Sequence, residues 1–442
     1  MDIFNAALAA VDPYKAVRRS LRLEDGRIHA GDGVYELDAF DRIMVVGAGK
    51  ATARMAMAAE GVLGDAVKGG IIIVKYGHTG DLKRIEQVEA AHPIPDEAGV
   101  EGTKRILELV RNAGERNLIL CLLSGGGSAL LVAPVGGITL EDKQRVTDLL
   151  LRSGASIGEL NAVRKHLSAV KGGRLARTAY PASLVTLILS DVIGDRLDVI
   201  ASGPTAPDGT TFADAALVVD KFGLKTALPP SVARFLERGL AGLEAETVKS
   251  GDACFGKTRN VIVGGLARAL AVARDKAEAL GYAPEIITSE LRGEARDAAH
   301  MLAQKAEHVR GALKAGERRC LLSGGETTVT VSGTGTGGRN QELALAFAQE
   351  IAGAEGIVLL SAGTDGTDGP TDAAGAVVDG STVKIAGKFD IHSEVYLERN
   401  DSYAFFAKLD RMIDDKHHII TGPTGTNVMD LQVILVEGKS ES

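Results

Sequence analysis

Short apolar runs alternate with longer alanine-rich amphipathic segments along most of the chain, and this alternation constrains the fold more than any other feature. It is typical of repeated β/α units on parallel sheets, so we predict an α/β fold. Several of the apolar runs end in Gly, Ser, Thr or Asp, and in open α/β sheets ligands bind outside the carboxyl ends of the strands. Strands are predicted at Arg42–Val46, Ile71–Val74, Leu118–Leu123, Leu184–Leu189, Asn260–Val263, Ala283–Thr288, Arg319–Leu322, Gly356–Ser361 and His418–Thr421.

The length of 442 residues favours two domains. The segment Thr205–Thr258 contains a Pro229-Pro230 pair and the polar stretch GLEAETVKSGD, which places the boundary near residues 240–255. We therefore predict domains at residues 1–245 and 246–442. The hexapeptide CLLSGG occurs at Cys121–Gly126 and again at Cys320–Gly325. This echo predicts a glycine-rich turn in each of two sheets and a ligand cleft between the two domains.

Composition excludes several classes of protein. Lys plus Arg number 50 and Asp plus Glu 58, for a net charge of −8, and Trp is absent, so nucleic-acid binding is not expected. Cys121, Cys254 and Cys320 have no zinc-type spacing and cannot all pair, which predicts neither a disulfide framework nor a structural metal. The acidic N-terminus and strand-length apolar runs predict no signal peptide and no membrane span. A cytoplasmic protein is the resulting expectation.

A match to the Walker A pattern occurs at Gly251–Thr258, GDACFGKT. In a working P-loop, a strand precedes the glycines and a helix follows the Lys. Here the preceding residues are polar and the strand-like NVIVGG follows, so Lys257 and Thr258 are predicted to lead into a strand. We therefore expect any nucleotide to bind at another loop.

The loop after the first predicted strand, VVGAGKATARM, has strand, glycines and helix in the order of half a dinucleotide fingerprint. Gly47 and Gly49 would let the backbone approach a ligand, and Lys50 would hold a phosphate or carboxylate at the helix start. Thr52 replaces the third glycine, and Lys75 stands where an NAD site would carry its ribose-binding acid. The simpler alternative is a tight βα turn with an exposed Lys.

A second loop, SGGGS, follows the strand LILCLL. Its residues Gly125, Gly126 and Gly127 can expose consecutive amides as an anion-binding nest, flanked by the hydroxyls of Ser124 and Ser128. The spacing does not fit a GxSxG nucleophile elbow. The alternative interpretation is a structural turn.

A cationic segment, NAVRKHLSAVKGGRLA, contains Arg164, Lys165, His166, Lys171 and Arg174. Helical spacing would place Arg164 and Lys171 on one face, which would suit an anionic ligand. A solvated charged face explains the same pattern equally well.

Acidic residues follow two other predicted strands. Asp191 ends one apolar run, and Asp365, Asp368 and Asp372 lie in the loop GTDGTDGPTD, where carboxylates can hold Mg²⁺ or accept a hydroxyl proton. Asp-Gly turn chemistry is the alternative. Two further groups could bind phosphate: Arg339 and Asn340 at a predicted helix start, and Thr421, Thr424, Thr426 and Asn427 after the last predicted strand.

Taken in order, these motifs resemble the glycerate 2-kinase family, whose C-terminal part is the MOFRL domain. The resemblance runs from about residue 5 to residue 436. It implies a Rossmann-like N-terminal domain, a C-terminal α/β domain with a mixed sheet and an active site in the interdomain cleft. The quoted motifs are GAGKA, EAAHPIPDEAG, LLSGGGSALL, NAVRKHLSAVKGGRLA, SDVIGD with IASGPT, LSGGETTV, GGRNQE, GTDGTDGPTDAAGA and TGPTGTNVMDL.

The resemblance implies ATP- and Mg²⁺-dependent phosphorylation of D-glycerate at its 2-hydroxyl. Family catalytic residues map onto Lys50 and Arg339, and Asp191 is our third catalytic candidate. Hydroxypyruvate reductase is the alternative activity, and a non-catalytic binding protein is a third class. Expected partners are D-glycerate and nucleotide, without nucleic acid or membrane, and a homodimer is left open. Candidate nucleotide ligands are Gly47, Gly49, Ser124–Ser128, Asn340, Thr424 and Asn427; candidate substrate ligands are Arg164, Lys171 and Asp365; candidate metal ligands are Asp191, Asp365 and Asp368.

Overall fold

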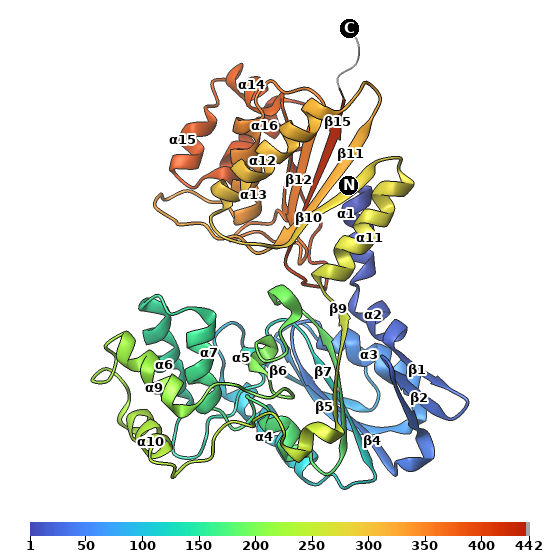
Figure 1. The fold of residues 1–442 in the computed structure, drawn as a ribbon, viewed down its shortest axis with the longest axis vertical. Coiled ribbons are helices and arrows are strands. Elements are labelled where there is room, and N and C mark those ends of the chain that lie inside the picture. The colour runs from blue at the N-terminus through green and yellow to red at the C-terminus, as the bar shows by residue number, and fades with distance from the viewer. Residues whose placement is uncertain (439–442) are drawn as a thin grey trace. The chain divides into compact units, whose positions relative to one another are not determined.

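The computed structural model describes residues 1–438 and divides into two compact units (Figure 1). The first unit spans Pro13–Val263, and the second joins Met1–Asp12 to the chain from Gly264 onward. Residues 246–263, which follow the predicted boundary, thus belong to the first unit. They end in strand β9 (Thr258–Gly264), where the side chain of Asn260 bonds to both the hydroxyl and the carbonyl of Thr205.

The first unit contains a six-stranded sheet in the order β6-β5-β4-β7-β8-β9. All pairs from β6 to β8 are parallel. Chain order reverses between the neighbours β4 and β7, so this is the topological switch point at which Rossmann-like sheets bind ligands. The strands, besides β9, are β4 (Arg42–Ala48), β5 (Val67–Lys75), β6 (Ile85–Ala90), β7 (Asn117–Leu123) and β8 (Ser183–Leu189).

Buried aliphatic strands such as Asn117–Leu123 need cover on both faces, and helices supply it. Helices α2 and α3 lie toward one face, with a small antiparallel sheet β1-β2-β3 beside them, while α4 and α8 cover the other (Figure 1). Their bounds are α2 (Pro13–Ser20), α3 (Thr52–Leu63), α4 (Glu97–Arg111), α8 (Arg174–Ala179), β1 (Leu21–Glu24), β2 (Arg27–Ala30) and β3 (Gly33–Glu36).

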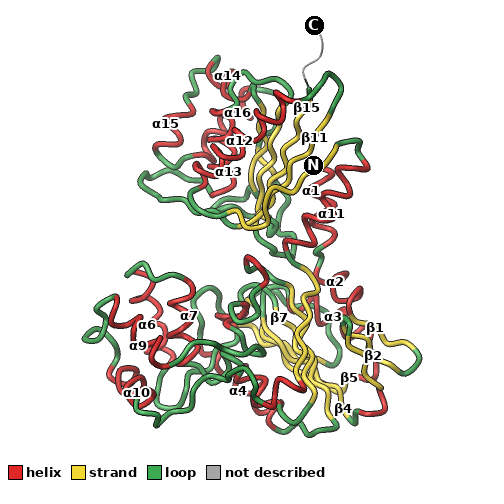
Figure 2. The backbone as a smooth tube through the Cα atoms, viewed as in Figure 1, coloured by secondary structure: helices red, strands yellow, loops and turns green. Residues whose placement is uncertain are grey.

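Four more helices of this unit form a group with a core of its own, visible beside the sheet in Figure 2. They are α6 (Leu140–Arg152), α7 (Ile157–His166), α9 (Phe212–Lys221) and α10 (Pro230–Leu240). Capping boxes begin three of them, at Thr139, Ser156 and Thr211, and satisfy the free amides of each first turn. Short helix α5 (Gly127–Leu130) follows β7.

The second unit has a mixed six-stranded sheet, in the order β10-β11-β15-β12-β13-β14. Only β10 and β11 pair in parallel, and β15 lies antiparallel between β11 and β12. Helices α1 and α11 pack against each other beside this sheet, while α12 to α16 lie toward its other face (Figure 1). The elements are α1 (Asp2–Ala10), α11 (Leu266–Ala279), α12 (Ala295–Ala312), α13 (Arg339–Glu350), α14 (Thr382–Gly387), α15 (Ser393–Glu398), α16 (Ser402–Met412), β10 (Ala283–Leu291), β11 (Arg318–Gly325), β12 (Ile357–Gly363), β13 (Gly375–Asp379), β14 (His418–Ile419) and β15 (Asp430–Glu437).

The α/β fold class, with a Rossmann-like sheet and a mixed sheet, is thus confirmed. The second CLLSGG echo is a correction, because Ser323, Gly324 and Gly325 continue strand β11 along β15 instead of forming a turn. The Walker-like segment does lead into strand β9, and Lys257 pairs with Glu115 at 2.8 Å. Within the described residues, no helix combines the length and the apolar character needed to cross a bilayer.

Close packing at Gly47 generates the first prediction. A Cβ at this position would overlap the carbonyl oxygen of Leu122 in the neighbouring strand, so Gly47→Ala should lower the free energy of unfolding by roughly 1–3 kcal/mol. Gly61→Ala is the matched control. Its new methyl, in helix α3, meets only the Tyr14 hydroxyl at 3.7 Å and should stabilise by up to about 1 kcal/mol. Urea midpoints compare the two, and equal midpoints would contradict the assigned packing.

Candidate active site

The loops that follow β4 and β7 touch at the switch point. The Lys50 amide donates to the Gly125 carbonyl at 2.9 Å, and the Ala51 amide donates to the Ser124 hydroxyl at 3.1 Å. Thr52 shares a 3.1 Å hydrogen bond with the same hydroxyl. Ser124 thereby joins the start of helix α3 to the end of strand β7. This structural role is sufficient to explain a Ser at this position.

Lys50 and His92 pack over the glycines of the second loop. A Cβ on Gly126 would lie 2.9 Å from the imidazole of His92 and 3.2 Å from Cγ of Lys50. Burial, reinforced by the positive charges of Lys50 and Lys75, lowers the pKa of His92 to about 4. His92 is therefore a neutral neighbour of the Lys50 ammonium at physiological pH.

Asp191 reaches the same place from the end of β8. Its carboxylate lies against Gly125, where a Cβ would collide with Oδ2, so only glycine allows this approach. The structure therefore brings together the predicted candidates Lys50, Asp191 and the nest Gly125–Gly127. Parallel neighbours β4, β7 and β8 explain why, because their carboxyl ends meet at one edge.

Ser128 collects the two predicted substrate cations. Its hydroxyl accepts from Arg164 Nη2 at 2.9 Å and from Lys171 Nζ at 3.2 Å, and it lies 2.8 Å from the Ser202 hydroxyl. Since both cations donate, the Ser128 proton must point to Ser202, whose own hydroxyl donates to Asn161 Oδ1 at 3.2 Å. The hydrogen bonds from the two cations through Ser128 and Ser202 to Asn161 therefore all donate in one direction.

The predicted shared helix face of Arg164 and Lys171 is wrong. Helix α7 ends at His166, and Lys171 lies in the following turn, before Gly172 and Gly173 with positive φ. Lys171 is fully buried, and its ammonium also donates to the carbonyls of Ser128 at 2.8 Å and Ala201 at 3.3 Å. Its contacts therefore position Ser128 and fix the left-handed residue Ala201, whose φ is 50°.

The other basic residues of this segment are partnered. Lys165 is buried and pairs with Asp208 at 3.2 Å, and His166 bonds to Glu246 at 2.9 Å. Arg174 donates to main-chain carbonyls, at 3.0 Å in the case of Ala245. These residues stabilise the helical group, so only Arg164 and Lys171 of the segment meet at the site.

Arg339 organises the site of the second unit. It begins helix α13, as predicted, and its guanidinium pairs with buried Asp430 at 2.6 and 3.0 Å and with Glu326 at 2.9 Å. Burial would lower the pKa of Arg339, but the hydrogen bond and charge of Asp430 raise it above its usual value. The residue lines a pocket of about 580 Å³ with Gly337 and Gly338.

Asp368 closes the start of helix α13. Its carboxylate accepts from the amides of Asn340 and Gln341, at 3.1 and 2.9 Å, and from the Gln341 side chain at 3.0 Å. Burial raises the pKa of Asp368 to about 6 in spite of these hydrogen bonds. Asn340 is buried and accepts from Ser361 at 2.7 Å. These contacts make Asp368 a helix cap and Asn340 part of the interior.

The remaining candidates of this unit lie in adjacent loops. Asp365 accepts from Thr367, and the Thr424 hydroxyl donates to the Thr364 carbonyl at 2.6 Å. Asn427 Oδ1 accepts from the amide of Met429 at 3.0 Å. Turn geometry accounts for the contacts of Asp365 and Asn427, and the Thr424 contact joins two loops. Ligand binding by Asp365, Thr424 and Asn427 stays a prediction.

Among residues 1–438, no three His, Cys, Asp or Glu side chains gather as a metal site. Mg²⁺ at phosphates usually takes only one or two protein carboxylates and otherwise binds water and phosphate oxygen. Asp191 lies at the strand ends beside the glycine nest, so it fits the role of a single carboxylate ligand to Mg²⁺. Asp368 does not, because helix amides and side-chain amides already occupy its oxygens.

Sequence reasoning missed two residues of this region, His92 and Lys143. His92 follows strand β6, which was not predicted, so its place at a strand end was hidden. Lys143 offered a detectable signal, since it takes a core position of helix α6 in line with Leu140, Val146 and Leu150. A Lys in an apolar helical stripe indicates a buried cation.

The two sheets and their strand order define a two-unit α/β protein with a Rossmann-like switch point. Residues 1–237 match the family model described as a domain of unknown function (DUF4147), and residues 319–430 match that of the MOFRL family. The chain belongs to the glycerate 2-kinase family, as its motifs predicted.

Three relatives illustrate this membership. D-glycerate 2-kinase of Thermotoga maritima is 43% identical over 99% of this chain and 97% of its own length. An Agrobacterium vitis protein, provisionally named hydroxypyruvate reductase, is 42% identical over 98% of this chain and 93% of its own length. The crystal structure of glycerate kinase from Thermotoga maritima superposes with a TM-score of 0.85 at 44% identity, covering 98% of this chain and 97% of that one.

The depressed pKa of His92 predicts a pH effect on stability. Below the unfolded pKa of 6.5, the unfolded chain takes up a proton that the folded imidazole takes up only near pH 4. The stability contributed by neutral His92 is therefore lost as the pH falls from 6.5 toward 4. We expect the urea midpoint of the wild type to fall more between pH 7 and pH 5 than that of His92→Gln. His29→Gln is the control, and its urea midpoint should fall as much as that of the wild type. An equal fall of the midpoint in the wild type and in His92→Gln would contradict the assignment.

Proposed function

We propose that the protein transfers the γ-phosphoryl group of ATP to the 2-hydroxyl of D-glycerate and yields 2-phosphoglycerate and ADP. The observation that carries this proposal is the meeting of Lys50, Asp191 and the Gly125–Gly127 nest at the switch point. Family membership supports it, since the Thermotoga maritima relative is named D-glycerate 2-kinase.

In this mechanism, the 2-hydroxyl oxygen attacks the γ-phosphorus and the bond to the β,γ-bridging oxygen breaks. Lys50 neutralises charge on the transferring phosphoryl oxygens, and amides of the glycine nest hold phosphate. The Asp191 carboxylate accepts the hydroxyl proton. His92 is neutral beside Lys50, so it adds no charge to the site and has no proton to donate as an imidazolium acid.

Mg²⁺, when bound, supplies further neutralisation of the phosphates, and Asp191 is the carboxylate that fits it. Arg339 is proposed to bind an anionic group of a substrate, with part of its guanidinium held by Asp430 and Glu326. That bidentate pairing fixes the orientation of the guanidinium plane. Arg164 is proposed to bind an anionic group of a substrate, and Lys171 to position Ser128.

Hydroxypyruvate reduction is the alternative. The loop Gly47–Thr52 lacks the third glycine of a dinucleotide fingerprint, and strand β5 ends in Lys75 where an acid would bind the ribose. Both features disfavour a nicotinamide cofactor, whereas a cation at the end of β5 suits phosphate.

Purified protein should consume ATP only with D-glycerate and Mg²⁺ both present, and phosphorus NMR should identify 2-phosphoglycerate. The same preparation should not oxidise NADH or NADPH with hydroxypyruvate, because the ribose-binding acid is replaced by Lys75. Nicotinamide turnover at the rate of ATP consumption would favour the reductase instead.

Lys50→Ala should lower kcat by on the order of a hundred- to a thousandfold, since it removes an electrostatic contact that strengthens in the transition state. Lys257→Ala is the matched control. This Lys belongs to the Walker-like segment but pairs with exposed Glu115, so kcat should stay near that of the wild type. Steady-state kinetics with circular dichroism as the folding check compare the two. A loss in the Lys257 variant as large as in the Lys50 variant would restore the P-loop hypothesis.

A further inference from the structure

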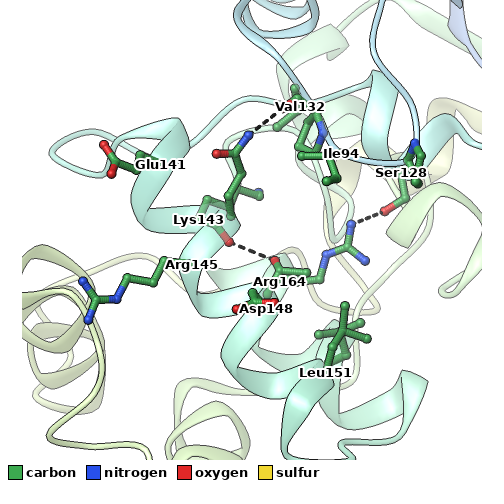
Figure 3. A pocket seen from close by; sticks show the side chains of 14 residues that line it. Ile94, Ser128, Val132, Glu141, Lys143, Arg145, Asp148, Leu151 and Arg164 are labelled. Atoms are coloured by element: carbon green, nitrogen blue, oxygen red, sulfur yellow. Dashed lines mark hydrogen bonds between the residues drawn. The ribbon is translucent and has the colours of Figure 1, made fainter.

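A pocket of about 690 Å³ lies within the first unit, between the helical group and the loops beyond the sheet. Helices α6 and α7 form one side, and the segment Pro93–Pro95 with Ser128 and Val132 forms the other. Figure 3 shows the Arg164 guanidinium reaching Ser128, with Glu141, Lys143, Arg145, Asp148 and Leu151 among the other residues around it. The volume falls within the roughly 300–1,000 Å³ of typical small-molecule sites.

One end of this pocket holds buried positive charge. Lys143 is only 4% exposed, and its ammonium has one weak hydrogen bond, to the Leu167 carbonyl at 3.4 Å. Nε of Arg164 is buried without a partner. Within residues 1–438, no carboxylate forms an ion pair with Lys143, Arg164 or the neighbouring Lys171. Buried charges are costly unless a counter-charge is close, so an anionic ligand would relieve this end.

Burial, reinforced by the charge of Arg164, lowers the pKa of Lys143 to about 7. The pKa of Lys171 is lowered for the same reasons, by burial first and then by Arg164 and Lys143. These shifts agree with the geometry: the cations repel one another and lack a counter-ion.

Most of the remaining exposed wall of the pocket is apolar, and the pocket is too large for a three-carbon acid. Its walls are formed by Ile94, Val132, Leu151 and Leu160 with Pro93 and Pro95. Glycerate is polar throughout and would leave such walls uncovered, whereas a flat heteroaromatic ring would cover them. Glu141 and Asp148, which also line the pocket, can accept hydrogen bonds from hydroxyl or amino groups.

The cationic end of the pocket adjoins the glycine-rich loop Ser124–Ser128. Ser128, which Arg164 contacts, directly follows the glycines over which Lys50 packs. A phosphate chain that starts at Arg164 would therefore run along this loop toward Lys50. A ligand with an apolar ring at one end and phosphates at the other fits both parts.

We propose that this pocket binds the purine nucleoside of the phosphoryl donor, with the ring between Ile94 and Leu151 and the proximal phosphates at Arg164 and Lys143. This inference rests on the proposed kinase function and assigns the nucleotide to one place in the first unit. Glycerate then binds elsewhere than among these apolar walls.

Isothermal titration calorimetry of the full chain with Mg²⁺ and ADP, and separately with D-glycerate, tests the proposal without turnover. Leu151→Glu places a negative charge on an exposed part of the wall, and Lys143→Met removes the buried cation. Each should raise the Kd for ADP by about tenfold or more and leave the response to D-glycerate unchanged. Leu217→Glu and Lys225→Met make the same changes at exposed positions outside the pocket and should bind ADP like the wild type.

The proposal requires both shifts. A normal Kd for ADP in either pocket variant, a loss of D-glycerate binding instead, or no ADP binding by the wild type would overturn it. Because the calorimetry measures binding, it tests the nucleotide pocket separately from the kinase function. If the Kd for ADP shifts as expected but no 2-phosphoglycerate forms, the kinase function is rejected and the nucleotide pocket is kept. Circular dichroism confirms folding of each variant.

Discussion

Close contact between the loops after β4 and β7 is the constraint on which the site of the first unit depends. Side chains at Gly47 or Gly49 would collide with Leu122 or Ser124, and one at Gly125 would collide with Asp191. Glycine at these positions lets two strand ends and the Asp191 carboxylate, from a third strand end, converge without intervening side chains. The convergence leaves Lys50 and the nest amides at a single point, where an anion can be held by backbone and side chain together.

Arg339 of the second unit is stabilised differently from Arg164 and Lys143 of the first unit. Arg339 is neutralised by Asp430 and Glu326, so its guanidinium is held in place before any ligand binds. Arg164 and Lys143 are held instead by neutral oxygens, of Ser128 and of the main chain. A paired cation gains little further from an anion, whereas unpaired buried cations gain much. This difference supports the proposal that phosphate binds at Arg164 and Lys143.

Much of this arrangement could be predicted because it depends on local patterns. Apolar runs located β4, β7 and β8, and the residues at their carboxyl ends followed from chain direction alone. Strand β15 was missed, although it carries the apolar run Val433–Val436 and lies between β11 and β12. Lys171 was predicted to share a helix face with Arg164 because helical spacing does not reveal that helix α7 ends at His166.

The sequence by itself determined the α/β class, the glycine-rich loops and the family, because periodicity and motif order are properties of neighbouring residues. Only the tertiary structure decided what these residues contact. It engaged Asp368 with the first amides of helix α13 and Asn340 with Ser361. It also made Lys171 a support for Ser128 and left Lys143 buried without an ion-paired carboxylate among residues 1–438. The reason is physical: desolvation and charge pairing depend on side chains brought together from distant parts of the chain, which no local pattern records.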